Sequence, residues 1–162
     1  MKCINKAVGD QQGTIAFTSD SDTTNHALAP GEQCDNQIIV EITSLDTALA
    51  GEDPSLIKID VEGYETPVLE GAHEILKNQT LNAVIMELNG SGSRYGFDES
   101  KILKLMLGNS FKTYSYDPFT RKLINLEGKN LDSGNTLFIR DKSFVDDRLR
   151  AAPKVTINGR QF

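Results

Sequence analysis

The chain has 162 residues, of which 38% are hydrophobic, and this is enough for one domain with a buried core. Its net charge of −6 argues against nucleic acid or an anionic membrane as a partner, because phosphate groups are bound by concentrated basic patches. No apolar run is long enough to span a membrane, and residues 1–20 lack the apolar core of a signal peptide, so we expect a cytoplasmic protein.

The N-terminal third is predicted to hold strands, a loop and a short helix. Residues 3–18 can form a hairpin, because a turn-forming segment joins an apolar start to an alternating run. The polar residues 19–36 are expected to form a long loop that is either functional or mobile. A β-branched run at 37–42 predicts another strand, and 44–49 predicts a short helix with Ser44 as its N-cap.

The central segment is predicted to pass directly from strand to helix. Residues 56–61 are apolar and β-branched with almost no alternation, which is typical of a strand buried on both faces of a parallel sheet. From Val68 onward the apolar residues follow the period of a helix. This helix is expected to begin at Thr66, just before a proline, and to end near Asn78.

The C-terminal half is predicted to complete the sheet. Residues 81–88 indicate the next buried strand, and 98–107 indicate a helix with Asp98 as N-cap and Gly108 just beyond its end. Three further segments predict a meander at an antiparallel edge: 112–116, 122–126 and 136–140.

Carboxylates cluster where two predicted parallel strands end. Asp60 and Glu62 project on one face if their strand stays extended, and Glu87 ends the neighbouring strand, with Asn89 two residues beyond. Ligands of open α/β sheets bind at this end, and a carboxylate there could act as a base or orient a hydroxyl group. Alternatively, Glu62 and Glu65 could simply cap the following helix. A divalent ion held by the first three acids is a further possibility, which their spacing alone does not establish.

The run Lys58–Glu65, with the segment 68–72 after it, resembles the signature of the FkbM-type methyltransferases, which are S-adenosylmethionine-dependent enzymes. The resemblance extends over residues 3–90, because three other segments are similar to parts of that family in the same order and at the same spacing: 5–10, 43–46 and 84–87. A lone Asp-x-Glu-Gly motif would be weak evidence for the family, whereas the ordered set of motifs is specific evidence.

The resemblance implies an α/β fold with a Rossmann-like class I methyltransferase sheet, whose usual strand order is 3-2-1-4-5-7-6. Residues 1–142 would form the methyltransferase domain, and 143–162 would be a polar tail with a fragment of helix. The resemblance also implies that Ala7, Val8 and Gly9 lie near the adenine of S-adenosyl-L-methionine. Plain strand core is the alternative interpretation of these three residues.

Two of the family's elements have no counterpart in this sequence, namely the glycine-rich turn after the first core strand and the acidic residue after the second. The resemblance therefore predicts an N-terminally incomplete sheet. The strand at 56–61 would keep an open edge, and the first strand of the chain would lack neighbours. Because open apolar edges find partners, a second copy or a separate N-terminal half-chain could fill this one.

The resemblance implies S-adenosylmethionine-dependent O-methylation of a sugar or small-molecule hydroxyl, and the residues offer Asp60, Glu62 and Glu87 as catalytic candidates. One alternative is a non-catalytic, methyltransferase-like remnant that binds a partner through its open sheet edge. Another is a metal-assisted hydrolase or phosphotransferase that uses the same three acids.

Three further side chains could belong to a site. Tyr64 and Tyr95 could line an acceptor pocket, and buried packing is the alternative for both. His26 lies in the polar loop and could reach a site only if that loop folds over it.

Overall fold

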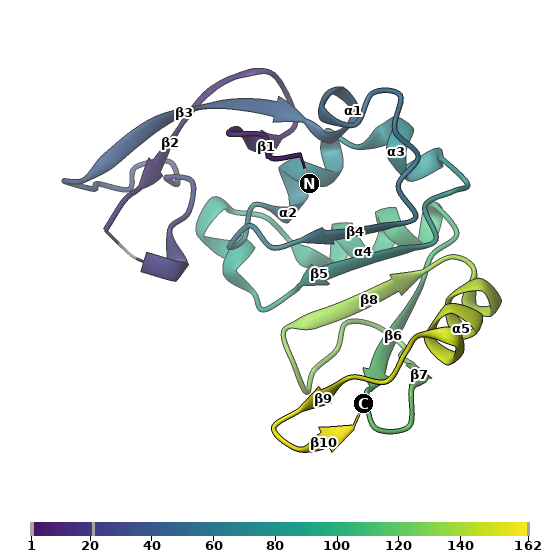
Figure 1. The fold of residues 1–162 in the computed structure, drawn as a ribbon. Coiled ribbons are helices and arrows are strands. Elements are labelled where there is room, and N and C mark those ends of the chain that lie inside the picture. Colours follow the sequence, from purple (N-terminus) through teal and green to yellow (C-terminus); the bar gives the residue numbers. More distant parts are fainter. Residues whose placement is uncertain (1, 21, 162) are drawn as a thin grey trace.

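The computed structural model describes residues 2–20 and 22–161 of the protein (Figure 1). Its strands are β1 Ala7–Gly9, β2 Gly13–Thr18, β3 Gln37–Ser44, β4 Leu56–Ile59, β5 Ala83–Glu87, β6 Lys112–Asp117, β7 Lys122–Asn125, β8 Asn135–Ile139, β9 Thr156–Ile157 and β10 Arg160–Gln161. Its α-helices are α1 Leu45–Ala48, α2 Glu65–Glu70, α3 His73–Lys77, α4 Glu99–Gly108 and α5 Lys142–Ala151. None of these helices is both long enough and apolar enough to cross a bilayer.

The large sheet has the order β4-β5-β8-β6-β7, with β4 parallel to β5 and the other neighbours antiparallel. The predicted parallel pair and antiparallel edge are confirmed, but the predicted meander is wrong because β8 inserts between β5 and β6. Burial explains the order: Phe138 and Ile139 of β8 are completely buried, whereas Lys122 and Ile124 of β7 are exposed. The more apolar strand therefore takes the centre, and the more polar one takes the edge.

At the other edge of the large sheet, β4 pairs with β5 alone among the described residues. The expected open edge is therefore present. The expectation that this strand is buried on both faces is wrong, since Leu56 is 54% exposed and Lys58 is also exposed.

The small sheet has the order β1-β3-β2. The predicted hairpin over residues 3–18 is wrong because β3 lies between β1 and β2, and for the same reason the first strand does have a neighbour. Ile42 of β3 is opposite Ala7 of β1 on one side and opposite Gly13 of β2 on the other. The long β-branched run of β3 can thus pair along both of its edges.

The helix expected to follow the central strand is two short helices, α2 and α3. A Cβ atom built at Gly71, between them, would lie 2.0 Å from the carbonyl oxygen of Gly9, so only glycine allows α2 to pack this closely on β1. The start of α3 is capped by Asp46, whose carboxylate accepts hydrogen bonds from the N–H groups of Glu74 and Ile75 at 2.9–3.1 Å. This separate cap lets α3 begin in a new direction.

The predicted N-caps Ser44 and Asp98 are confirmed, because their side chains accept hydrogen bonds from the first turns of α1 and α4. The predicted place of Gly108 just beyond α4 is wrong. The left-handed residue is Ser110, with a φ of 67°, and the N–H of Phe111 donates to the carbonyl of Met106 at 3.1 Å. This Schellman closure turns the buried Phe111 into the core.

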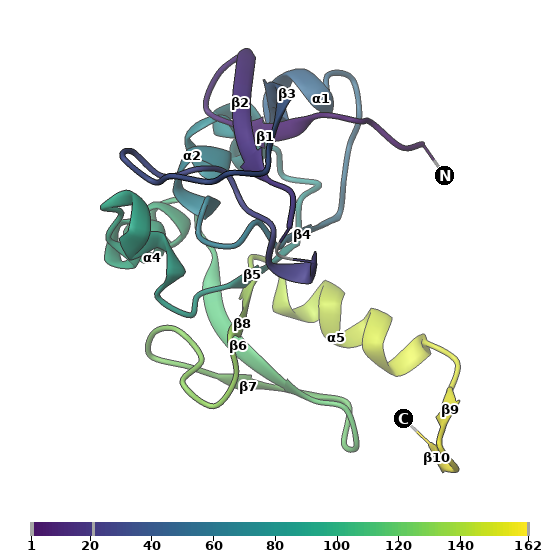
Figure 2. The same cartoon turned by 90° about the vertical axis from the view of Figure 1, so that its left-hand side faces the viewer.

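The core lies between the large sheet and the helices α2, α3 and α4. In Figure 2, α4 lies on one side of the large sheet and α5 on the other, with the hairpin β9–β10 beyond the end of α5. The segment expected as a polar tail thus contains a ten-residue helix, which Asp141 caps by accepting a hydrogen bond from the N–H of Phe144. The largest fully buried side chains are Phe111, Phe138, Leu69, Leu81, Met86, Leu88, Met106 and Ile139.

Candidate functional site

Three carboxylates meet at the carboxyl ends of β4 and β5. Asp60 directly follows β4, Glu62 lies two residues later, and Glu87 is the last residue of β5. One oxygen of each lies within 4.8 Å of the others. The prediction that these side chains come together is confirmed, and their catalytic role remains a prediction.

The route by which Glu62 reaches this cluster differs from the expected one. The strand ends at Ile59, and the chain then turns through Glu62 and Gly63, whose φ angles are 53° and 99°. A Cβ atom at Gly63 would lie 2.6 Å from the carbonyl carbon of Ser91, so the turn packs directly on the loop after β5. A tight turn, and not an extended strand, therefore holds Asp60 and Glu62 together.

Gly134 supports the position of Glu87, and the sequence interpretation missed it. A Cβ atom at Gly134 would lie 2.5 Å from Glu87 Oε1. The sequence signal is a glycine in the turn before β8. The φ of this glycine is not in the left-handed region, so its importance is the space it leaves: any side chain here would displace the Glu87 carboxylate.

A cavity of about 450 Å³ opens beside Asp60 and Glu62, between the two sheets. Its wall includes Ala7 and Val8, two of the three residues proposed to contact the cofactor, together with Lys6, Phe17, Asn25, Val61 and Tyr64. The third, Gly9, is buried and does not line the cavity: a Cβ atom there would lie 2.6 Å from Ile42 Cδ1. The structure therefore places Gly9 in the packing behind the cavity.

The described parts of the polar loop, residues 19–20 and 22–36, fold toward this cavity. Its backbone pairs with β2, since the N–H of Thr18 donates to the carbonyl of His26 at 3.0 Å. The hydroxyl of Tyr95 donates to the carbonyl of Ala27 at 2.6 Å. The loop brings Asn25 into the cavity wall, whereas the ring of His26 contacts Glu32 at 3.0 Å and does not line the cavity.

A comparison with protein families finds that residues 2–116 match the methyltransferase FkbM domain. The chain belongs to this family. The match covers the small sheet, β4, β5, α1 to α4 and nearly all of β6, and it includes the carboxylate cluster and the residues that line the cavity. Membership supports a methyltransferase function in general terms. Neither the comparison with curated proteins nor the comparison with solved structures found a match.

In this FkbM domain, Tyr64 of the cavity wall belongs to a cluster of three aromatic rings. The ring centroids of Tyr64, Tyr95 and Phe97 are 5.3–6.3 Å apart. Burial raises the pKa of Tyr95 to about 12 and also raises the pKa of Tyr64, so both phenols are protonated at neutral pH. Tyr95 packs and anchors the loop, as the packing interpretation expects, whereas Tyr64 both packs and lines the cavity.

Two other acidic residues of the signature have distinct surroundings. Glu65 is buried, its carboxylate accepts a hydrogen bond from the N–H of Gly63 at 3.3 Å, and burial raises its pKa. This hydrogen bond is made to the turn, and α2 has no side-chain cap hydrogen bond, so Glu65 holds the turn of the FkbM signature and the capping interpretation is not confirmed. Asp60 is half-exposed and forms an ion pair with Lys58 through its Oδ2 atom.

Proposed function

We propose that this FkbM-type domain transfers the methyl group of S-adenosyl-L-methionine to a hydroxyl group of a sugar or another small molecule. The observation that carries the proposal is one cavity, of a size usual for small-molecule sites, whose wall combines Ala7 and Val8 with Asp60 and Glu62. The order β4-β5-β8-β6 supports it as well, because it corresponds to the 4-5-7-6 half of the family's sheet.

The cavity wall suits the adenine end of the cofactor. Ala7, Val8 and Val61 offer apolar surface to a flat ring, and the amide of Asn25 can both donate and accept hydrogen bonds. When bound, the cofactor supplies a methyl group activated by its positively charged sulfur.

The chain's own groups then orient the acceptor and take its proton. Lys58 contacts Asp60 Oδ2, so we assign proton acceptance to Oδ1. Glu62 and Glu87 accept hydrogen bonds from neighbouring hydroxyl groups of the acceptor and fix its orientation, which is the main contribution a protein makes to a direct displacement.

We further propose that the ribose and the methionine end of the cofactor are held with the help of a partner on the open edge of β4. This edge is unpaired among the described residues, and Leu56 on it is 54% exposed. A second copy or a separate N-terminal half-chain would add its strand there.

The test is calorimetric titration of the folded chain with S-adenosyl-L-methionine, followed by measurement of S-adenosylhomocysteine release with a panel of sugars and small alcohols. Saturable binding and acceptor-dependent release are expected, and sedimentation in parallel reports whether binding requires self-association. A folded chain that binds no cofactor at any protein concentration would contradict independent activity and favour a non-catalytic remnant.

A second candidate is a metal-assisted hydrolase or phosphotransferase. It is favoured by the approach of the carboxylates of Asp60, Glu62 and Glu87 to within 4.8 Å, because Mg²⁺ prefers oxygen ligands. Turnover of phosphate esters that requires a divalent ion and no S-adenosyl-L-methionine would support this candidate. Methyl transfer that persists in a chelator would contradict it.

A further inference from the structure

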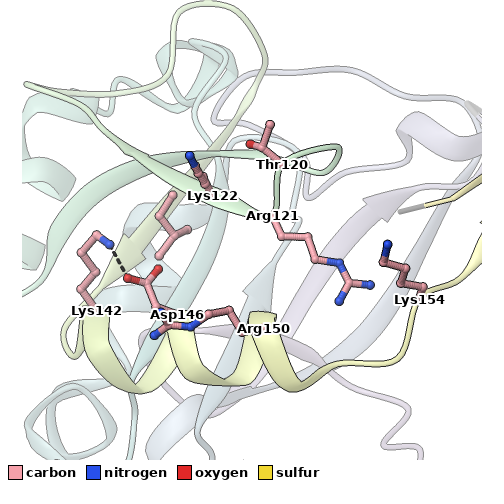
Figure 3. Close-up of a pocket in the computed structure, with 8 residues that line it drawn as sticks. Thr120, Arg121, Lys122, Lys142, Asp146, Arg150 and Lys154 are labelled. Atoms are coloured by element: carbon pink, nitrogen blue, oxygen red, sulfur yellow. Dashed lines mark hydrogen bonds and ion pairs between the residues drawn. The ribbon is translucent and has the colours of Figure 1, made fainter.

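A second cleft lies between α5 and the turn that joins β6 to β7. It has a volume of about 470 Å³ and is lined by Thr120, Arg121, Lys122, Leu123, Lys142, Asp146, Arg150 and Lys154. Figure 3 shows Arg121 and Lys122 on the side of the β6–β7 turn and β7, opposite Lys142, Asp146 and Arg150 on α5. The lining of the cleft therefore comes from two separate elements and from Lys154, which follows α5.

The charge of this part of the chain is opposite to that of the rest. Residues 117–162 contain nine of the 17 Lys and Arg residues but six of the 23 Asp and Glu residues, which gives them a net charge of +3. The preceding 116 residues have a net charge of −9. Such asymmetry within one chain favours an anionic ligand for the basic part.

The walls of the cleft are fixed by Arg121. Its guanidinium donates to the carbonyls of Leu149, Ala152 and Pro153 at 3.3, 2.6 and 3.2 Å, which ties the end of α5 to the start of β7. Its own φ is 54°, a backbone conformation that favours glycine or asparagine. The hydrogen bonds to α5 offset the cost of this conformation and hold the two walls at a fixed separation.

Two of the five basic side chains have carboxylate partners. Lys142 forms an ion pair with Asp146, and Arg150 contacts Asp147 at 2.6 Å. Lys122 and Lys154 form no salt bridge with any residue that the structure describes. The cleft therefore has a surplus of positive charge available to a ligand.

We propose that this cleft binds a phosphate-bearing anion, either a small phosphorylated molecule or the headgroup of an anionic phospholipid. Its volume is in the range of small-molecule sites, and its lining carries five basic side chains against one carboxylate, which suits the negative charge of a phosphate group. The cleft lies outside the part of the chain that matches the FkbM domain, so this site is distinct from the methyl-transfer cavity.

Calorimetric titration of the full chain with inorganic pyrophosphate tests the site. The double variant Lys122→Gln/Lys154→Gln should bind pyrophosphate about tenfold or more weakly, because two charge-assisted contacts are lost. The control is Lys101→Gln/Lys104→Gln, which removes the same charge from exposed positions of α4 and should change the affinity by about twofold at most. Circular dichroism verifies that both double variants are folded.

Sedimentation with vesicles distinguishes the two sources of phosphate. The vesicles are made of phosphatidylcholine and phosphatidylserine. If the chain sediments with them but does not bind pyrophosphate, and the Lys122/Lys154 variant no longer sediments with them, the cleft binds a lipid headgroup. If the original chain binds pyrophosphate and this variant does not, the cleft binds a small phosphorylated ligand. The proposal is overturned if neither probe binds, or if the control variant weakens binding as much.

Discussion

The guanidinium carbon of Arg140 lies 4.2 Å from the centroid of the Phe111 ring. The same guanidinium donates hydrogen bonds to the backbone carbonyls of Leu76, Asn78, Leu81 and Asn109. These carbonyls belong to the end of α3, the segment before β5 and the end of α4. One residue at the end of β8 therefore ties together three segments that are distant in sequence.

We expect Arg140→Met to lower the free energy of unfolding by about 2–4 kcal/mol, because it leaves several partly buried carbonyls without donors. Arg140→Lys should recover only part of this loss, since an ammonium group cannot reproduce the planar fork of donors. Urea unfolding measures both, with the exposed Arg148→Met on α5 as control. Equal stability of Arg140→Met and Arg148→Met would contradict the role of this residue.

Gly134→Ala tests whether the position of Glu87 matters for catalysis. The added Cβ atom would lie 2.5 Å from Glu87 Oε1, so the carboxylate must leave its present position beside Asp60 and Glu62. We expect turnover in the methyl-transfer assay to fall by about tenfold or more, because small displacements of orienting groups are costly. Gly128→Ala is the matched control, since nothing lies within 4 Å of its added Cβ atom. Full activity of Gly134→Ala would remove Glu87 from the site.

Asp60→Asn tests the assigned base. If Asp60 accepts the proton of the acceptor hydroxyl, turnover should fall by about 10²-fold or more, while calorimetric binding of S-adenosyl-L-methionine should change little. The exposed Glu52→Gln removes one negative charge elsewhere and should leave turnover unchanged. Unchanged turnover of Asp60→Asn would exclude this residue as the base.

Glu65→Gln should alter how stability depends on pH. Burial raises the pKa of Glu65 above its ordinary value of 4.5, so the folded state holds the proton more tightly than the unfolded state does. The resulting stabilisation is fully present below pH 4.5 and is lost as the pH rises through the raised pKa. The free energy of unfolding of Glu65→Gln, relative to the original chain, should therefore increase between about pH 4 and pH 7. Urea unfolding at both pH values measures the free energy of unfolding of the two chains. A difference between them that stays the same at the two pH values would contradict the prediction.

Two glycine substitutions should have opposite effects on stability. Gly71→Ala places a Cβ atom 2.0 Å from the carbonyl oxygen of Gly9 and should destabilise the fold by about 1–3 kcal/mol, because β1 and α2 must separate. Gly108→Ala adds a methyl group with no neighbour within 4 Å at the last residue of α4, and should stabilise the fold by about 0.5 kcal/mol. Thermal unfolding measures the melting temperature of both variants. A shift of the same sign in both would contradict this prediction.

Local chemistry determined a large part of this protein. The caps Ser44 and Asp98 act within one turn of their own helices, so their role could be predicted from residues nearby in sequence. The meeting of Asp60 with Glu87 could be predicted as well, because parallel neighbouring strands end at the same edge of a sheet. The family followed from an ordered set of short motifs.

The tertiary structure decided what depends on distant partners. Two strands lie between strands that are closer to each other in sequence: β3 between β1 and β2, and β8 between β5 and β6. This order depends on which apolar faces bury the most surface together, and the sequence pattern of a single strand does not contain that information. Gly71 leaves space for the backbone of Gly9, and Gly134 leaves space for the side chain of Glu87, which are 62 and 47 positions away. Close packing is decided between such segments, so only the folded chain reveals it.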